Sequence, residues 1–438
     1  MNDKKQVRAW CLYDFGNSAF ATTILAAVLP TYFSQVIYKG TSSATAVWGI
    51  ITTIAMLIVA VGSPILGAIS DSANTKKKFW AFFMAIGCVA TALLFFPGPG
   101  DTLFLSVVFV VANIGFTGSL VFYDAFLPHI VSRDRMDKVS AAGYAWGYIG
   151  GGILLVVNML MIMNPGSIFG EGDPGNLGIR LSFVSVSVWW ILFSLPMFKH
   201  IHEPVFSEAA PRKKAGAAVK EGVRQLAVTL KHIRQHKELF KFLIAFFLYI
   251  DGVGTIIRMA TVFASDPALG LTNHLADATG GLLNMTMVMA LGLLITQIVA
   301  WPMSFLFGWI GQKKGAKNTI YICIVAYTII AILGTFMFAD WNFLVLAALV
   351  GTVQGGIQAM SRSLFAHMIP KEQSGEFFGF FGIFEKFASI LGPLLMSLVA
   401  LLTDNVRFSV LAVIPLFIIG GLVLIKVKTP DTRVVSTK

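Results

Sequence analysis

The chain has 438 residues, of which 56% are hydrophobic and 13% are charged, and its mean hydropathy is +0.77. Soluble proteins carry roughly twice this share of charged residues, so the composition excludes a chain built from soluble domains. The net charge of +11 would suit a nucleic-acid-binding protein, but the basic residues lie in short connectors between apolar runs. That placement is typical of a membrane protein, and we expect no nucleic-acid partner.

Long apolar segments recur along the whole chain. One of them, Val47–Ile69, carries no charge and is longer than the ~20 residues that cross a bilayer as a helix. We therefore predict an all-α membrane protein with twelve transmembrane helices. The predicted spans are 15–36, 46–69, 79–97, 103–127, 140–163, 180–198, 239–263, 281–310, 318–338, 342–365, 376–402 and 408–426.

Lysine and arginine are unevenly distributed between the two sets of connectors. Twelve helices place both termini on one side, and the termini and connectors of that side hold 26 of the 33 basic residues. The connectors of the other side hold only Lys39, Arg180 and Arg407. Because basic loops remain in the cytoplasm, we predict that both termini are cytoplasmic.

The longest connector, residues 200–238, joins the sixth and seventh spans and is strongly basic. Apolar residues recur in it at intervals of three and four, which predicts an amphipathic helix lying on the anionic lipids of the inner leaflet. These residues are Val219, Val223, Leu226, Leu230 and Ile233. His232 and His236 lie one turn apart, but no third ligand is near them, so we predict no metal site.

The two halves of the chain repeat each other. Gly67 and Asp71 close the second span, and Gly308 and Gln312 close the eighth span at an offset of 241 residues. Prolines follow the fourth and tenth spans at an offset of 242 residues. Two nearly equal offsets indicate two six-helix bundles related by a pseudo-two-fold axis. The predicted division is 1–199 for the N-terminal bundle, 200–238 for the linker and 239–438 for the C-terminal bundle with its short tail.

The loop after the second span, with Gly67, Asp71 and the basic run Lys76–Lys78, resembles the signature loop of major facilitator transporters. The resemblance implies that the glycine allows close approach of helices and that the aspartate helps to hold the outward-facing state. It therefore implies a gating role for Gly67, Asp71 and Lys76. The second copy departs from the pattern because Gln312 replaces the acid, and any docking there is expected to be weaker and uncharged.

Several further motifs are similar to one branch of that superfamily, the vacuole effluxers, which comprises fungal vacuolar amino-acid effluxers and their bacterial relatives. The motifs are Trp10–Phe20, Tyr123–Pro128, Tyr249–Gly252, Gln354–Phe365, Gly375–Gly379 and Gly392–Pro393. The resemblance implies a major facilitator fold and transport of amino acids. The compact loops are more similar to those of a bacterial member, which implies a multi-pass protein of the bacterial cytoplasmic membrane.

Ionisable residues inside the predicted spans are candidate site residues, because each costs a few kcal/mol in a bilayer and usually faces a partner or a wet cavity. Asp251 and Arg258 lie about 10 Å apart along one face of the seventh span, where Gly252 and Gly254 favour a helix break. In a central site, Asp251 would bind a proton or cation and Arg258 a carboxylate. The alternatives are a structural contact of Asp251 to another helix and an Arg258 side chain that reaches the outer surface.

The eleventh span carries Glu385 and Lys386, which point about 100° apart and therefore need separate surroundings. We assign both to the substrate and proton site. Lys386 matches a basic position of the resembled branch and would bind an anionic group, or else balance Asp14 or Asp124. Later in the same span, Gly392–Pro393 predicts a kink.

The first span opens with Asp14, Asn17 and Ser18, a polar stripe that is explained either by solute or proton binding or by helix capping. Asp124 and Arg362 lie near the predicted inner ends of the fourth and tenth spans. We assign both to gating. A structural pair would also explain Asp124, and the positive-inside bias would also explain Arg362.

We predict a secondary active transporter that moves a small polar or zwitterionic solute, amino acids first, by alternating access and with proton coupling. The acids within the spans are the reason to expect coupling. The sequence contains no metalloprotease or serine-hydrolase motif and no phosphate-binding loop, so we predict neither an enzyme nor an ATP-driven pump, and no cofactor. The expected partners are the solute, protons and inner-leaflet lipids, and we expect a monomer. The alternative is a transport-inactive lipid-handling or sensory protein of the same fold.

Overall fold

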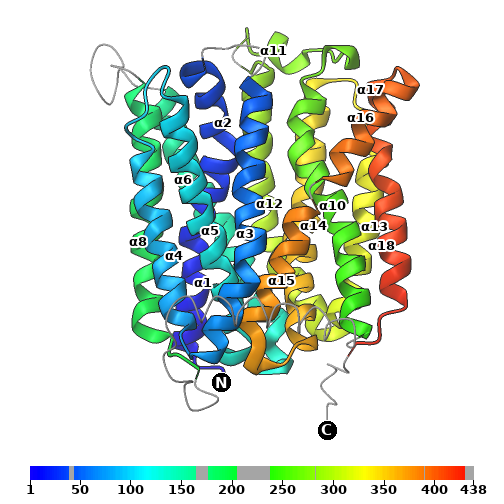
Figure 1. Ribbon diagram of the computed structural model, residues 1–438. Coiled ribbons are helices and arrows are strands. Elements are labelled where there is room, and N and C mark those ends of the chain that lie inside the picture. Colours follow the sequence, from blue (N-terminus) through cyan, green and yellow to red (C-terminus); the bar gives the residue numbers. More distant parts are fainter. Residues whose placement is uncertain (39–43, 164–175, 205–236, 282, 389, 430–438) are drawn as a thin grey trace. The chain divides into compact units, whose positions relative to one another are not determined.

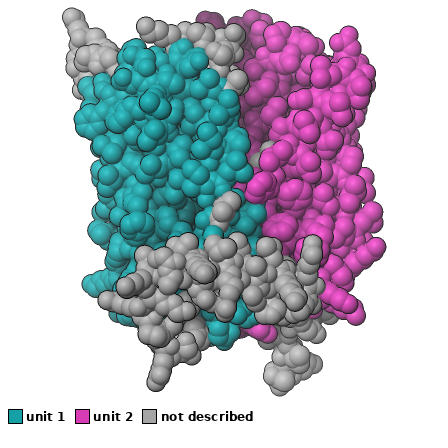
Figure 2. Space-filling view, viewed as in Figure 1, with its two compact units in different colours: residues 1–132, 146–228, 370–383 teal, residues 133–145, 229–369, 384–438 magenta. Residues whose placement is uncertain are grey.

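A computed structural model describes residues 1–38, 44–163, 176–204, 237–281, 283–388 and 390–429, and its helices are labelled in Figure 1. The amphipathic helix predicted for the linker lies outside the described residues. The chain divides into two compact units, which Figure 2 shows in different colours. Unit 1 comprises residues 1–132, 146–228 and 370–383, and unit 2 comprises residues 133–145, 229–369 and 384–438.

Most of unit 1 consists of the helices of the first six predicted spans. The first of these is not uniform, because the helix widens into π-helical turns on both sides of Pro30. Proline has no N–H to donate and its ring displaces the preceding turn, which accounts for this irregularity. The first span comprises α1 (Lys4–Ala19), a π-helix (Phe20–Ala27), α2 (Leu29–Tyr32) and a second π-helix (Phe33–Ile37). The following helices are α3 (Ala44–Ser72), α4 (Lys76–Leu93), α5 (Thr102–Ile130), α6 (Met136–Met163) and α8 (Leu177–His200).

Most of unit 2 consists of the helices of the last six spans. The long helices are α10 (Lys237–Ala264), α12 (Met285–Lys314), α13 (Ala316–Gly334) and α14 (Asp340–Met368), with a short α11 (His274–Ala278) before α12. The eleventh span is broken into α15 (Ser374–Phe387) and α16 (Leu391–Thr403). The twelfth consists of α17 (Val406–Ser409), a 3-10 turn (Val410–Val413) and α18 (Ile414–Ile425).

Among the described residues, eleven helical segments are long and apolar enough to cross a membrane. The remaining predicted span is α4, which has 18 residues and begins with three lysines. Each predicted span therefore coincides with a helix, which confirms the all-α membrane fold. The helix break predicted at Gly252 and Gly254 is wrong, because α10 runs through both without interruption. The eleventh span is interrupted just before Gly392–Pro393, which confirms the kink predicted there.

Close packing in unit 1 depends on small residues and on stacked aromatic rings. Gly87 of α4 and Gly115 of α5 face each other so closely that a Cβ on Gly115 would lie 2.4 Å from the Cα of Gly87. Such contacts let helix backbones approach in the absence of side chains. Elsewhere in the unit, the ring of Trp10 stacks on Tyr123 with the ring centroids 4.4 Å apart, and both side chains are fully buried.

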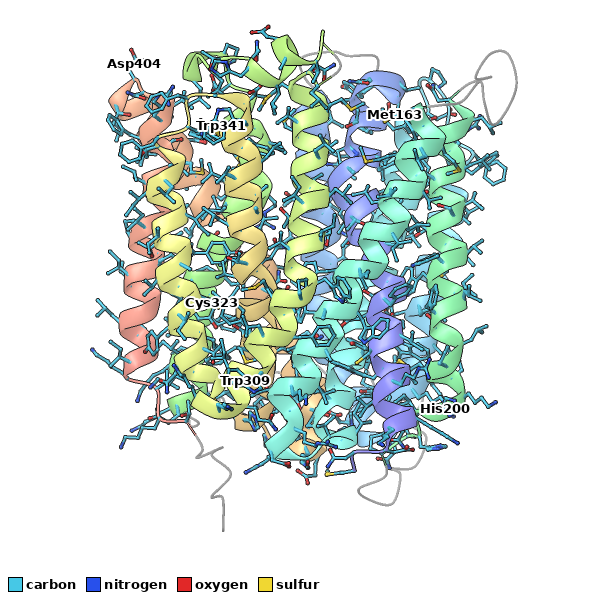
Figure 3. All side chains as sticks on the ribbon, turned by 180° about the vertical axis from the view of Figure 1, so that it is seen from behind. Met163, His200, Trp309, Cys323, Trp341 and Asp404 are labelled. Carbon is cyan, nitrogen blue, oxygen red and sulfur yellow. The ribbon has the colours of Figure 1, made fainter. Side chains whose placement is uncertain are left out.

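Unit 2 exposes tryptophans near opposite ends of its long helices. Trp309 lies near the end of α12 and Trp341 at the start of α14, with 50% and 47% of their surfaces exposed (Figure 3). Tryptophans at both ends are typical of the two membrane–water interfaces. The ammonium group of Lys313 lies 3.9 Å from the centroid of the Trp309 ring, an arrangement that keeps this charge at the polar end of the helix.

Candidate functional site

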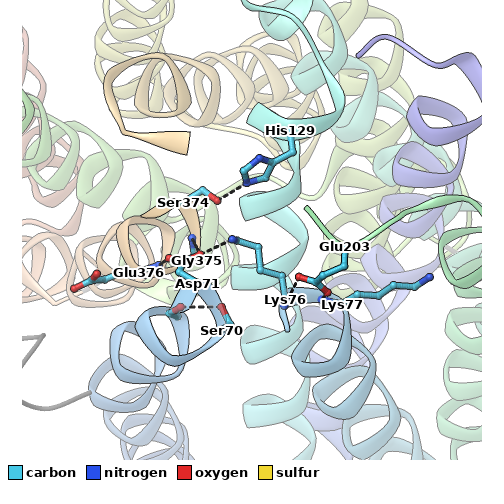
Figure 4. Close-up of polar contacts among 10 residues, drawn as sticks. Ser70, Asp71, Lys76, Lys77, His129, Glu203, Ser374, Gly375 and Glu376 are labelled. Carbon is cyan, nitrogen blue, oxygen red and sulfur yellow. Dashed lines mark hydrogen bonds and ion pairs between the residues drawn. The ribbon is translucent and has the colours of Figure 1, made fainter. Parts of the chain in front are cut away.

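A buried aspartate at the end of α3 is held by the first turn of α15. Asp71 accepts hydrogen bonds from the backbone N–H groups of Gly375 at 3.1 Å and Glu376 at 2.8 Å. Lys76 Nζ lies 2.5 Å from Asp71 Oδ1, and the lysine is only 1% exposed. We name Asp71, Lys76, Gly375 and Glu376 the first polar cluster (Figure 4). The carboxylate meets the positive end of the α15 dipole and also neutralises a buried ammonium group.

The close approach of α3 and α15 depends on glycine in both helices. A Cβ on Gly67 would lie 2.3 Å from the carbonyl oxygen of Gly375. Further along, a Cβ on Gly379 would lie 2.6 Å from the Cα of Pro64. Because these neighbours are backbone atoms, neither can move aside as a side chain could. Gly67 thus occupies the kind of close contact that the resemblance implies for it.

Two residues that no sequence motif reveals extend this cluster. Glu203, just after α8, accepts hydrogen bonds from the N–H groups of Lys76 and Lys77, each at 2.7 Å, and so caps α4. Burial raises the pKa of Glu203, although the two N–H groups act in the opposite direction. His129, at the end of α5, forms a 2.8 Å hydrogen bond with the hydroxyl of Ser374, where α15 begins (Figure 4).

In unit 2, the guanidinium of Arg362 joins α14 to the start of α6. Its Nε donates to Ser140 Oγ at 3.0 Å and its Nη2 donates to the Ser140 carbonyl at 2.8 Å. The guanidinium also lies 4.3 Å from the centroid of the Tyr144 ring. Arg362 is 3% exposed, so its interactions are those of a buried structural arginine and not those of a surface charge. The gating assignment of Arg362 stays a prediction.

The second copy of the loop motif has Gln312 in place of the acid, and an acid of α6, Asp137, lies beside this copy. Asp137 accepts a hydrogen bond from Ser363 and lies 3.4 Å from Nε2 of His367, and all three side chains are buried. Gln312 donates to the carbonyl of Asp134 at 3.3 Å, which is an uncharged contact. The available sequence signal was an acid just before the predicted span 140–163. We name the following residues the second polar cluster: Asp137, Ser140, Arg362, Ser363 and His367.

Asp251, at the middle of α10, is fully buried and faces the break in the eleventh span. Its Oδ1 and Oδ2 accept from the N–H of Gly392 at 3.2 and 3.1 Å. Thr255, one turn later on α10, packs on the same glycine, since a Cβ on Gly392 would lie 1.9 Å from Thr255 Oγ1. Asp251 thus contacts another helix. The contact is at the helix start, where the backbone N–H groups have no partner within the helix itself.

The side chain of Arg258 lies back along α10, beside Gly254, and does not extend toward the end of the helix. A Cβ on Gly254 would lie 2.4 Å from Arg258 Nη2. The guanidinium is close enough to attract the carboxylates of both Asp251 and Glu385. Arg258 and Glu385 are exposed and Lys386 is half-buried. We name the following residues the intramembrane cluster: Asp251, Thr255, Arg258, Glu385 and Gly392.

Asp14 and Asn17 lie inside α1, which begins at Lys4, so the capping explanation for them is wrong. Asp14 Oδ2 accepts from the hydroxyl of Tyr123 at 2.7 Å, and Asn17 Nδ2 donates to the carbonyl of Tyr13 at 3.0 Å. Both side chains are buried in unit 1. A buried carboxylate bonded to a phenol is a proton-binding candidate in its own right.

The structure thus separates the candidate residues into several groups. Gly67, Asp71 and Lys76 lie together, Arg362 lies in the second polar cluster, and Asp124 is half-buried on α5. The predicted substrate and proton residues divide between unit 1, with Asp14 and Asn17, and unit 2, with Asp251, Arg258, Glu385 and Lys386. Among the described residues, no group of three or more histidine, cysteine or acidic side chains is arranged to hold a metal ion.

Comparison with known proteins identifies the family. A family model described as "Vacuole effluxer Atg22 like" matches residues 36–434, which is most of the chain. The chain belongs to this family. It is 40% identical over 425 residues to a Bacillus subtilis (strain 168) protein described as the uncharacterized MFS-type transporter YxiO, covering 96% of this chain and 94% of the relative. It is 24% identical over 486 residues to autophagy-related protein 22 of Vanderwaltozyma polyspora, covering 95% and 90% respectively.

Solved structures share the fold at low sequence identity. The transporter FucP in its outward conformation matches with a TM-score of 0.66 at 12% identity, covering 97% of this chain and 98% of that chain. The proton:xylose symporter XylE matches with a TM-score of 0.65 at 12% identity, covering 98% and 96%. The major facilitator fold and the vacuole-effluxer resemblance are therefore confirmed. The family and its fold are those of multi-pass membrane transporters, not of enzymes.

Proposed function

We propose that this vacuole-effluxer family member is a proton-coupled transporter of small polar or zwitterionic solutes, amino acids first, in a bacterial cytoplasmic membrane. The bacterial relative described as a transporter supports the choice of membrane. The concentration of basic residues in one set of connectors supports cytoplasmic termini. The resemblance to vacuolar amino-acid effluxers supports the choice of amino acids.

The observation that carries this proposal is the position of Asp251. A fully buried carboxylate at the middle of a membrane span costs free energy of insertion, so its presence indicates a function such as proton binding. It lies at a helix break, and broken helices near the bilayer midplane are where secondary transporters bind solutes and ions. Arg258 supplies a positive charge nearby, which would attract the carboxylate of an amino acid.

The two polar clusters support a gating role on the cytoplasmic side. In this proposal, the first polar cluster and the second polar cluster hold helix ends together while the transporter is open to the outside. Each cluster combines buried charge with hydrogen bonds to a helix start, an arrangement that is stable only when its partners stay in contact. Opening toward the cytoplasm would then require both clusters to separate.

A transport-inactive lipid-handling or sensory protein is the second candidate. Such a protein would have no need for a buried acid and an arginine within its spans, because each lowers the stability of the inserted helix. The presence of Asp251, Arg258 and Glu385 in one region of unit 2 therefore favours transport.

The proposal is tested by uptake into proteoliposomes that contain the purified protein. Radiolabelled amino acids of each charge class are added with and without an imposed pH gradient, and a protonophore is then used to collapse the gradient. We expect gradient-driven uptake that Asp251→Asn abolishes. The control is Asp404→Asn, because Asp404 is an exposed residue at the end of α16 whose left-handed backbone suits asparagine equally well.

Two results would contradict this proposal separately. Uptake that continues unchanged after the gradient collapses would exclude proton coupling while leaving transport in place. No uptake of any amino acid, together with uptake of another solute class such as sugars, would exclude the substrate assignment.

A further inference from the structure

The break in the eleventh span creates a helix start inside the membrane. Helix α16 begins at Leu391 and has 13 residues, and the N–H groups of its first turn have no partner within the helix. The N–H of Gly392 donates to both carboxylate oxygens of Asp251, at 3.2 and 3.1 Å. A carboxylate therefore already occupies the positive end of this half-helix.

A second hydrogen-bond donor near this position belongs to Thr255. The hydroxyl of Thr255 is fully buried, and its hydrogen bond stabilises the carboxylate of Asp251. It lies against Gly392, where a Cβ would approach its Oγ1 to 1.9 Å. A buried hydroxyl that donates to a carboxylate stays satisfied only while a carboxylate occupies this turn. A solute carboxylate at this turn would accept the same hydrogen bond if Asp251 left it.

A third group brings positive charge to the same carboxylate. The guanidinium of Arg258 lies back over Gly254 and attracts Asp251 and Glu385. Arg258 lies within a span, where a charged group usually faces a partner or a wet cavity. The Gly392 amide, the Thr255 hydroxyl and the Arg258 guanidinium thus suit an anion, and Asp251 is the anion present.

We propose that this part of the intramembrane cluster is a carboxylate-binding subsite that Asp251 fills when ionised and opens when protonated. The inference rests on the proposed proton-coupled transport. Two ionised carboxylates do not share one small site, because their repulsion raises the pKa of one of them. A protonated Asp251 no longer competes for the amide and the guanidinium, so a solute carboxylate takes its place. Proton and solute then bind together, and each increases the affinity for the other by the same factor.

The groups around Asp251 make it the residue that titrates in this exchange. Arg258 on the same helix acts on Asp251, and Glu385 of α15 acts on Arg258. Helices α16 and α18, which pack against α10, carry no titratable side chain. From α13 and α14, Cys323 and Ser361 interact with Tyr249 in this part of α10. Lys386 follows Glu385 and points to a different side of α15.

The test uses acetate as the simplest carboxylate and acetamide as its uncharged isostere. Thermal unfolding of the detergent-solubilised full chain is followed with each probe from about pH 6 to about pH 8.5, a range in which acetate remains ionised. We expect acetate to bind the native chain about tenfold more weakly for each pH unit above the pKa of Asp251. Asp251→Asn should bind acetate independently of pH, with the affinity that the native chain reaches at low pH. Acetamide should have no effect on either protein.

Two further variants keep the inference testable if Asp251→Asn is poorly folded. Arg258→Gln retains Asp251 and should lose the acetate effect at every pH, whereas Thr255→Val should weaken it. Equal acetate effects in the native chain and in Asp251→Asn at every pH of the range, or no acetate effect in either, would overturn the subsite. If acetate behaves as expected but proteoliposomes take up no amino acid, the subsite stands and the proposed substrate fails. If amino-acid uptake is proton-driven but acetate binding ignores Asp251, the proposed function stands and the subsite fails.

Discussion

Gly67 and Gly375 meet so closely that a side chain on the first would overlap the backbone of the second. The predicted Cβ position on Gly67 is 2.3 Å from the carbonyl oxygen of Gly375, 2.6 Å from its carbonyl carbon and 2.8 Å from the N–H of Glu376. These atoms belong to the same turn of α15 that bonds Asp71. The glycine and the aspartate of the loop motif therefore act on one contact, in which close approach brings the amides within reach of the carboxylate.

Replacing Gly67 with alanine should separate α3 from α15. The added methyl group meets backbone atoms that cannot rotate away, so we expect a loss of about 1–3 kcal/mol in the free energy of unfolding. Gly62→Ala on the same helix is the control, because a Cβ there meets nothing within 4 Å. Thermal unfolding of the two variants checks this. Equal melting temperatures for both would show that the contact is looser than described.

Replacing Asp71 with asparagine should destabilise the chain through Lys76. The ammonium group is buried and would lose its partner, which costs roughly 3–5 kcal/mol when one member of a buried pair is removed. The double variant Asp71→Asn/Lys76→Met removes both charges and should recover much of this loss. A double-mutant cycle on thermal unfolding measures the interaction. If the double variant is as unstable as the sum of the two single ones, the two residues are independent.

Arg362→Lys should not preserve the second polar cluster although it preserves the charge. A lysine cannot donate to both oxygens of Ser140 in the geometry of the guanidinium, nor stack on Tyr144 in the same way. We expect a loss of about 1–3 kcal/mol in unfolding free energy together with slower transport. Arg135→Lys serves as the control, since Arg135 is exposed in the same unit. Unchanged stability and uptake in Arg362→Lys would show that charge alone matters there.

Glu203 should make stability depend on pH in the weakly acidic range. Burial raises its pKa in the folded chain above the ordinary value of 4.5, so the folded state holds this proton more tightly than the unfolded state does. The corresponding stability is present below pH 4.5 and is lost as the pH rises through the folded pKa. Glu203→Gln should remove this dependence. Melting temperatures of both proteins across that range give the comparison, and parallel curves would contradict the expected shift.

Span positions were predictable because run length and hydrophobicity act locally. The start of the first helix was not predictable from hydrophobicity. The helix begins at Lys4, and the charged residues Lys5 and Arg8 lie in turns that precede the apolar run. The capping explanation for Asp14 failed for the same reason. A cap can be recognised only when the true end of the helix is known.

The partners of the charged residues were beyond the reach of a single sequence. The Ser363 hydroxyl reaches Asp137 across 226 positions, and the Gly392 amide reaches Asp251 across 141. Periodicity shows which face of a helix a residue occupies, but not which distant helix that face meets. The glycine–proline pair predicted the kink in the eleventh span. That a carboxylate from another helix occupies the resulting helix start follows only from the packing.

Two helices each belong to both compact units. Helix α6 leaves unit 2 after Ala145, and α15 leaves unit 1 after Ile383. Neither helix is interrupted at the residue where the compact unit changes. Gly143 and Gly147 flank the first point and Gly382 adjoins the second, and a residue without a side chain lowers the local bending stiffness of a helix.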